Sequence, residues 1–279
     1  KPVTLKANSY SEIGLDFLAP GSRQVVVQAI TRSGRVTSYM LDERGKGLRA
    51  LGGDIINFAP SATKEIFIPA IPHTVKKIGT KLVELPHSLR LLVPGEIDAR
   101  VSVKVLSTDG TFIPAGLENK LVKAGSVVAL DLNPKLPASK FGIQISSDEP
   151  LVASVFSATL AEGKSDFIWS TAVPALTKFS LATSGIAPQL IFIGGAITAE
   201  AELFFNNGKR KQVVITGSEI ATLKVPDGVR SVTFTKVGKG IYGAGLVATK
   251  SGYGYFPLAA GSLLTKSSVP LSNIRVLTP

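Results

Sequence analysis

The sequence contains no cysteine, one methionine (Met40), one tryptophan (Trp169) and two histidines (His73 and His87) among its 279 residues. The absence of cysteine excludes a disulfide framework, a cysteine nucleophile and thiolate metal ligands. No run of about 18 apolar residues occurs, so no segment is predicted to span a bilayer as a helix. Because the only methionine is Met40 and the chain begins Lys-Pro-Val-Thr, we expect a leader or a longer upstream region to precede residue 1.

Charged residues are also scarce, at 18%, while hydrophobic residues make up 44%. This composition predicts a folded chain, since disordered segments are poor in apolar residues. The net charge of +11 indicates affinity for polyanions. However, the basic residues are scattered and do not interleave with the aromatic residues, which argues against a specific nucleic-acid site.

Alternation of apolar and polar residues is the main local pattern. It predicts strands at residues 25–30, 99–107, 141–146, 151–158, 201–205 and 231–235. Thr-Asp-Gly at 108–110 and Asn-Asn-Gly at 206–208 predict hairpin turns. The best helical pattern, at residues 73–85, is broken by Gly79 and flanked by prolines. We therefore predict an all-β fold of tandem antiparallel, immunoglobulin-like β-sandwiches.

Three stretches of the chain share one order of motifs, which indicates a degenerate internal repeat. The second copy consists of GSVVALDL (125–132), FGIQISSDEPLVASVF (141–156) and SDFIWSTAVPALTK (165–178). In the same order, the first copy has YSEIGLDF (10–17), VVVQAITRSGRVTSYM (25–40) and GGDIINFAPSATK (52–64). The third copy has GSEIATLK (217–224), SVTFTKVGKGIYGAGL (231–246) and GYGYFPLAAGSLLTK (252–266). Only the second and third copies have a further front half. We predict a partial first β module at 1–62, a second β-sandwich at 63–176 and a third at 177–279.

The adjacent acids Asp148 and Glu149 lie in Ser-Ser-Asp-Glu-Pro, between two alternating stretches. The corresponding positions hold Arg-Ser-Gly in the first copy and Gly-Lys-Gly in the third. A chemical site would require carboxylates, whereas a chain reversal requires only turn-forming residues. We therefore interpret these acids as the corner of a β-hairpin.

Other motifs carry little chemistry. Gly238, Gly240 and Gly243 match G-x-G-x-x-G, but a strand rather than a helix is predicted after them, so no nucleotide cofactor is expected. His73 and His87 lie in one predicted linker beside prolines and lack a third metal ligand. We expect no metal, no other cofactor and no positioned histidine base.

Four aromatic residues are the best candidates for a binding site. Phe167 and Trp169 share one face of a predicted strand, and Tyr253 and Tyr255 take similar places in the third copy. On an exposed face such pairs could stack on sugar rings, and on an inner face they would belong to the core. We name these four as candidate glycan-stacking residues.

The motif order GSVVALDL, FGIQISSDEPLVASVFSA and a tryptophan-containing strand resembles the repeated modules of an uncharacterised family of actinobacterial secreted or envelope proteins. The element Ser-Asp-x-Pro-Val-x-Ala is also similar to one in extracellular modules of the IgG-Fc-binding type. The resemblance implies an extracellular or cell-envelope location and offers no catalytic residues. The third copy departs from the pattern because it has no aspartate in GSEIATLK.

From these features we predict a protein that is not an enzyme. Its sandwiches would act as a structural spacer or as a binding surface for an anionic cell-wall polymer, a glycan or another envelope protein. Two alternatives remain: an assembly subunit of a surface or phage structure, and a carbohydrate-active enzyme or accessory subunit with acids at a module interface. Glycosidase chemistry needs two nearby acids, and the candidates are Asp16, Glu96, Asp98, Asp131 and Asp166.

Overall fold

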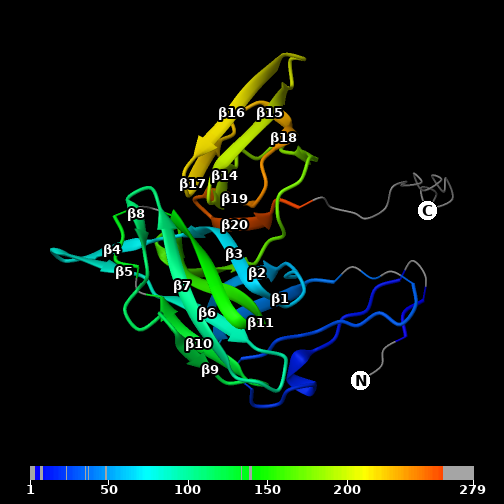
Figure 1. Cartoon of the computed structure of the whole chain (residues 1–279), viewed down its shortest axis with the longest axis vertical. Coiled ribbons are helices and arrows are strands. Elements are labelled where there is room, and N and C mark those ends of the chain that lie inside the picture. Colours follow the sequence, from blue (N-terminus) through cyan, green and yellow to red (C-terminus); the bar gives the residue numbers. More distant parts are fainter. Residues whose placement is uncertain are drawn as a thin grey trace.

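The computed structural model describes residues 4–6, 9–22, 24–34, 36, 38–47, 49–132, 134–137 and 140–259. Two β-sandwiches follow one another along the chain, with a separate hairpin near the N-terminus (Figure 1). The predicted all-β fold is confirmed, and η1 (Leu15–Phe17) is the single short helix of the described part. A helix with the length and apolar character of a membrane span does not occur there. Residues 1–3 and 260–279 of the predicted modules lie outside the described residues.

The second predicted module forms a sandwich of two antiparallel sheets. Its strands are β3 (Thr63–Pro72), β6 (His87–Leu92), β7 (Ala99–Ser107), β8 (Gly110–Phe112), β9 (Lys120–Val122), β10 (Val127–Leu132), β11 (Lys140–Ala161) and β12 (Lys164–Thr171). One sheet has the order β10–β6–β11–β12, and the other has the order β3–β11–β7, with β8 and β9 both paired to β7. The two sheets enclose one apolar core, in which Ile68, Val103 and Leu89 are fully buried.

Strand β11 belongs to both sheets. Its ladder with β7 ends at Ser147, and its ladder with β6 begins at Val152. The predicted hairpin corner at Asp148 and Glu149 is therefore wrong, because the chain does not reverse there but passes from one sheet to the other. Asp148 stabilises the crossing by accepting a hydrogen bond from the backbone N–H of Arg100 on β7, at 2.7 Å.

The third module repeats this arrangement with separate strands. They are β13 (Ser180–Ala182), β14 (Gln189–Gly194), β15 (Ile197–Phe205), β16 (Arg210–Gly217), β17 (Ile220–Lys224), β18 (Val229–Val237), β19 (Ile241–Thr249) and β20 (Gly252–Pro257). The sheet β17–β14–β19–β20 has the strand order of β10–β6–β11–β12, and the sheet β13–β18–β15–β16 has that of β3–β11–β7–β8. Here the two parts of β11 correspond to two strands, β18 and β19. The predicted turns at 108–110 and 206–208 are both confirmed.

Within its described residues, the first predicted module contributes one hairpin, β1 (Met40–Lys46) with β2 (Arg49–Ile56). Residues 24–34 contain no strand, so the predicted strand at 25–30 is wrong. An alternating sequence becomes a strand only when another strand takes up its backbone hydrogen bonds. The aromatic rings of Tyr10 and Phe17, each 92% exposed, lie on the surface of this region.

A second small hairpin extends from the second sandwich. It consists of β4 (Val75–Ile78) and β5 (Lys81–Glu84), and in Figure 1 it projects away from the rest of the molecule. Gly79 has a φ of 61° in its turn, which explains why this stretch does not form the helix that its spacing loosely suggests. We call this hairpin, residues 75–84, the arm.

Candidate functional site

The predicted aromatic pair lies under the β1–β2 hairpin. Phe167 and Trp169, on β12, are only 4% and 9% exposed, and they form a buried cluster with Ile56 of β2. Met40 of β1 and Phe156 of β11 pack against the same cluster. The hairpin therefore covers the face of β12 on which a sugar would have to stack.

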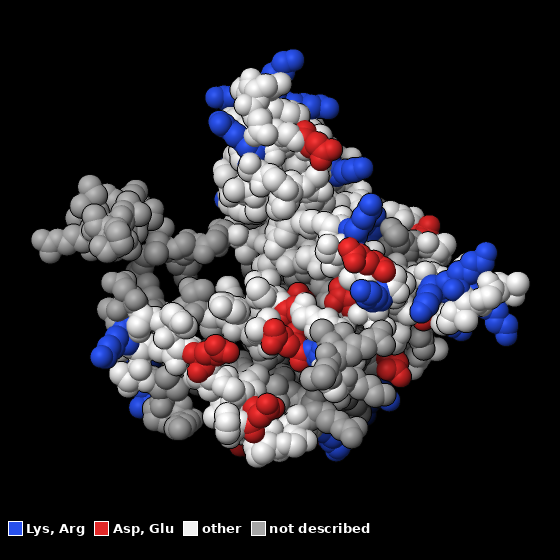
Figure 2. Space-filling model, turned by 180° about the vertical axis from the view of Figure 1, so that it is seen from behind, with Lys and Arg blue, Asp and Glu red and all other residues white. Residues whose placement is uncertain are grey.

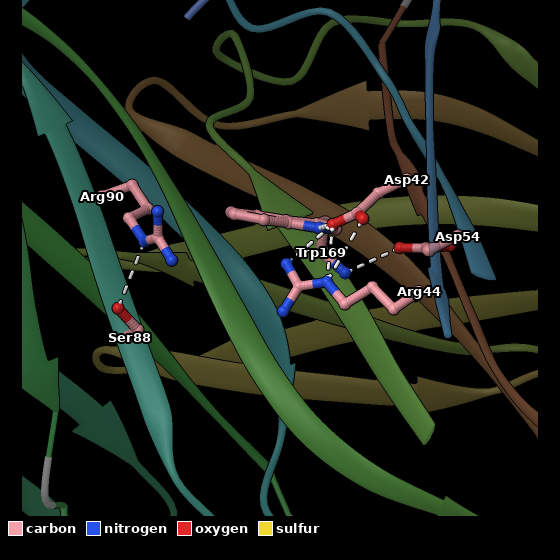
Figure 3. Close-up of polar contacts among 6 residues, drawn as sticks. All are labelled: Asp42, Arg44, Asp54, Ser88, Arg90 and Trp169. Atoms are coloured by element: carbon pink, nitrogen blue, oxygen red, sulfur yellow. Dashed lines mark hydrogen bonds and ion pairs between the residues drawn. The ribbon is translucent and has the colours of Figure 1, made fainter. Parts of the chain in front are cut away.

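Polar contacts hold the β1–β2 hairpin over this face of β12. The indole N–H of Trp169 donates to Asp42 Oδ2 at 2.9 Å, and Arg44 Nη2 donates to the same oxygen at 2.8 Å. Figure 3 shows the contacts of the Asp42 carboxylate with the indole of Trp169 and with the guanidinium group of Arg44. The Arg44 guanidinium carbon also lies 4.3 Å from the ring centroid of Phe156 and 4.6 Å from that of Phe167. Burial alone would raise the pKa of Asp42, but the hydrogen bonds from Arg44 and Trp169 outweigh it and leave this pKa below its ordinary value.

A second carboxylate caps the edge of β12. Asp54 Oδ2, on β2, accepts a hydrogen bond from the backbone N–H of Trp169 at 2.7 Å. Burial raises the pKa of Asp54 to about 6, although the N–H groups of Trp169 and Ile55 favour its charged form. The negative charges of Asp166 and Asp42 add to this rise. Asp42, Arg44 and Asp54 thus hold the β1–β2 hairpin against β12 around Trp169.

The two tyrosines of the third module take different positions. Tyr255 is 8% exposed, and its hydroxyl donates to the backbone oxygen of Thr171 at 2.7 Å. Burial raises the pKa of the Tyr255 hydroxyl well above its ordinary value. Tyr253 is partly buried and packs against a second buried cluster, which includes Tyr255, Ile168 and Ile191. The glycan-stacking role of the four residues stays a prediction, and for Phe167, Trp169 and Tyr255 it would require the covering segments to move.

Sequence reasoning missed the partners of Trp169, although a signal for them exists. Asp42 and Arg44 follow Met40 at every second position of β1, and the internal repeat aligns Met40 with Phe156. Residues of one parity lie on one face of a strand, so all three side chains reach the covered face. What the sequence does not contain is the position of that face relative to β12.

The two histidines do not lie in a linker, contrary to the sequence prediction. His73 follows β3 directly, His87 begins β6, and His73 Nδ1 lies 3.0 Å from His87 Nε2. His87 Nδ1 lies 2.9 Å from Ser157 Oγ on β11. All three side chains are buried, and His87 shares the inner face of β6 with Leu89.

Hydrogen bonds link the three side chains in the order His73, His87, Ser157, and the tautomer of each imidazole sets which nitrogen donates. The carboxylate of Glu84 lies 3.8 Å from His73 Nε2. This is the order of groups in a nucleophile–base relay, but Ser157 is fully buried and no substrate reaches it. The chain therefore serves to hold β3, β6 and β11 together.

Of the acids named for glycosidase chemistry, Glu96 and Asp98 share the β6–β7 loop, and the other three lie on separate elements. Asp16 is exposed in η1, Asp131 is exposed on β10, and Asp166 is half-buried on β12. Asp98 forms an ion pair with Lys123 at 2.6 Å. Glu96 lines a hollow of about 410 Å³ together with Glu149, between the β6–β7 loop and the crossing of β11.

A smaller hollow of about 170 Å³ lies near the contact between the sandwiches, and Glu65 is the only acid that lines it. Groups of three or more metal-ligating side chains are not found in the described part of the chain.

Comparison with known proteins gives a family but no activity. A model of a family of unknown function, DUF5719, matches residues 1–203. The chain belongs to this family. The DUF5719 match spans the first two predicted modules and ends within β15. No curated protein matches the sequence significantly. A crystal structure of Thermotoga maritima 1070 is similar with a TM-score of 0.33 and 15% identity, over 40% of this chain and 93% of that one, a likeness too low to carry an argument.

Proposed function

We propose that the chain is a non-catalytic part of a secreted or envelope protein, in which sandwiches derived from an internal repeat form a stiff spacer with binding surfaces. The resemblance of its motifs to modules of actinobacterial envelope proteins supports this location. The equal strand order of the two sandwiches supports the repeat. The hairpins β1–β2, β11–β12 and β19–β20, which occupy corresponding places in the three copies, support it as well.

The observation that carries the spacer role is the apolar joint between the sandwiches. Side chains of both modules share one buried cluster, made of Ala70, Ile168, Val173, Ile191, Ala244, Leu246 and Tyr255. Next to it, the rings of Phe67 and Tyr242 stack with their centroids 3.7 Å apart. Domains joined by large apolar contacts move relative to one another much less than domains on free linkers.

The connection between the sandwiches is also fixed. Val173 and Leu176 are 4% and 5% exposed, and the backbone N–H of Leu176 donates to the oxygen of Ile241 at 2.6 Å. At the edge of the joint, Lys104 Nζ lies 2.6 Å from Glu219 Oε1. This half-buried ion pair adds a contact between the two sandwiches but little energy. Flexible linkers are rich in glycine and serine, whereas residues 172–179 contain neither, and Ala172, Val173 and Leu176 among them are buried.

Pulsed electron spin resonance on the full chain tests the stiffness. Cysteines placed at Glu118 and Asn207 would be the only thiols, because the chain has none of its own. Both positions are exposed, one on each sandwich. We expect a single narrow distribution of distances between the two spin labels.

A joint variant and a matched control make the test specific. Ile191→Ala combined with Leu246→Ala removes joint contacts, at a cost of about 2–5 kcal/mol for each residue, and should broaden the distribution. Val214→Ala truncates an apolar side chain that is 68% exposed, and it should leave the distribution unchanged. A broad distribution in the chain with an intact joint would contradict the spacer role.

A further inference from the structure

The arm exposes apolar side chains that a stable fold would normally cover. Ile78 and Leu82, beside its turn, are 56% and 73% exposed, and Val75 and Val83 are each 41% exposed. All four strand residues of β4 are exposed, as are three of the four in β5. A lone two-stranded hairpin is marginally stable in water. Clustered apolar side chains on a projecting element indicate a binding partner.

Positive charge surrounds these apolar side chains. The arm carries Lys76, Lys77 and Lys81 against a single acid, Glu84, which lies at its base. Figure 2 shows Lys and Arg side chains gathered at the projecting arm, which lies to the right in that view. The partner should therefore combine negative charge with an apolar phase.

The pairing of the strands distributes both kinds of side chain over both faces. Lys77 lies opposite Leu82, and Ile78 lies opposite Lys81. Directly paired residues point to the same side of a hairpin, and successive residues point to opposite sides. Each face of the arm therefore presents one large apolar side chain and one lysine next to the turn.

The base of the arm is anchored. The backbone N–H of Leu85 donates to the oxygen of Thr74 at 2.9 Å, directly below the last strand pair. Glu84 faces His73, whose side chain is buried in contact with His87. The arm thus continues from β3 and β6 of the second sandwich, and its tip is exposed.

We propose that the tip of the arm inserts into the interfacial layer of an anionic lipid bilayer. A protein partner that covers one face would leave either Ile78 or Leu82 in water, and an anionic polymer would pair the lysines but cover neither. A bilayer interface surrounds the tip on both faces and offers phosphates to the lysines, whose stems reach along apolar surface. This role does not depend on the stiffness of the joint.

The dimensions fit this mode of binding. A strand of four residues with a rise of about 3.3 Å per residue is about 13 Å long. Interfacial elements insert their apolar side about 5–10 Å deep, so the outer half of the arm can enter while its base stays in water. Each lysine near an anionic surface strengthens binding about fivefold, and salt weakens this contribution.

Flotation of the full chain with lipid vesicles tests the proposal. We expect binding to phosphatidylcholine vesicles that contain an equal part of phosphatidylglycerol, and much weaker binding to pure phosphatidylcholine. Replacement of the arm lysines (Lys76→Gln, Lys77→Gln, Lys81→Gln) should weaken binding to the anionic vesicles about a hundredfold. Ile78→Ser with Leu82→Ser should weaken it at least tenfold. Circular dichroism should stay unchanged, because the arm contributes no side chain to either core.

A matched control separates the arm from the general charge of the protein. Lys209→Gln, Lys211→Gln and Lys239→Gln remove the same charge from exposed positions of the third sandwich, and they should leave vesicle binding within about threefold. Equal loss in this control, or retained binding after the arm lysines are replaced, would overturn the proposal. If the serine variant keeps full affinity, or if a soluble polyanion displaces the vesicles completely, the partner is an anionic polymer and the bilayer is ruled out.

Discussion

The buried histidine pair predicts how the stability of the fold depends on pH. Burial, assisted by the neighbouring His73, lowers the pKa of His87 from 6.5 to about 4. The unfolded chain therefore binds a proton at this site before the folded chain does. The contribution of His87 to stability is complete above about pH 6.5 and is lost as the pH falls towards the folded-state value. A difference of about 2.5 pKa units corresponds to about 3 kcal/mol in the free energy of unfolding.

The variant His87→Gln isolates this contribution. Its amide does not titrate, and it replaces the hydrogen bonds to His73 and Ser157 only in part, so the variant should be about 1–3 kcal/mol less stable near pH 7. Between about pH 7 and about pH 4 the difference in stability should shrink by about 3 kcal/mol and approach zero or reverse. Urea unfolding followed by the fluorescence of Trp169, the sole tryptophan, measures both proteins at each pH.

Asp54, which is remote from His87, titrates in the same range, and the comparison removes its effect. The raised pKa of Asp54 acts in the opposite direction, because the folded chain binds this proton more tightly than the unfolded chain. Its cost is present above about pH 6 and is relieved as the pH falls. Since both proteins retain Asp54, its effect cancels in their difference. A difference between wild type and His87→Gln that stays constant across this range would refute the reasoning.

Two further predictions concern the contacts of β12. Asp54→Asn keeps an acceptor for the backbone N–H of Trp169 without a buried charge, so it should raise the free energy of unfolding by about 1 kcal/mol near pH 7 and by nothing near pH 4, in the same urea assay. A loss of stability near pH 7 would contradict the raised pKa. Gly252 has a φ of 126°, and a Cβ on it would lie 2.6 Å from Asp166 Oδ2. Gly228 serves as the control, because it has a φ of 78° and open space around it. Gly252→Ala should lower the free energy of unfolding by about 3 kcal/mol and Gly228→Ala by about 1 kcal/mol, so the midpoint of thermal unfolding should fall further in the first variant. The added variant Asp166→Ala should restore part of the loss, and a loss that stays the same would exclude a clash with Asp166.

Local pattern was sufficient for much of the architecture. The alternation in β7 and β15 determined these strands, because one face of each must be buried while the other meets polar surroundings. The turns at 108–110 and 206–208 followed from a glycine at positive φ, 132° at Gly110 and 81° at Gly208, which is a purely local requirement. The equal strand order of the two sandwiches was not predicted from the sequence, and the division into modules stays a prediction.

Contacts between distant segments were decided by the tertiary structure alone. Residues 25–30 have the strand pattern but no partner strand, and β11 continues through Ser-Ser-Asp-Glu-Pro because each of its halves finds a different sheet. His87 and Ser157 meet across 70 positions of sequence, and Asp42 meets Trp169 across 127. Period 2 assigns a side chain to a face, but it does not say what covers that face. Which segment covers a face depends on how the rest of the chain packs. Phe167 and Trp169 on β12 are buried because the β1–β2 hairpin lies over them.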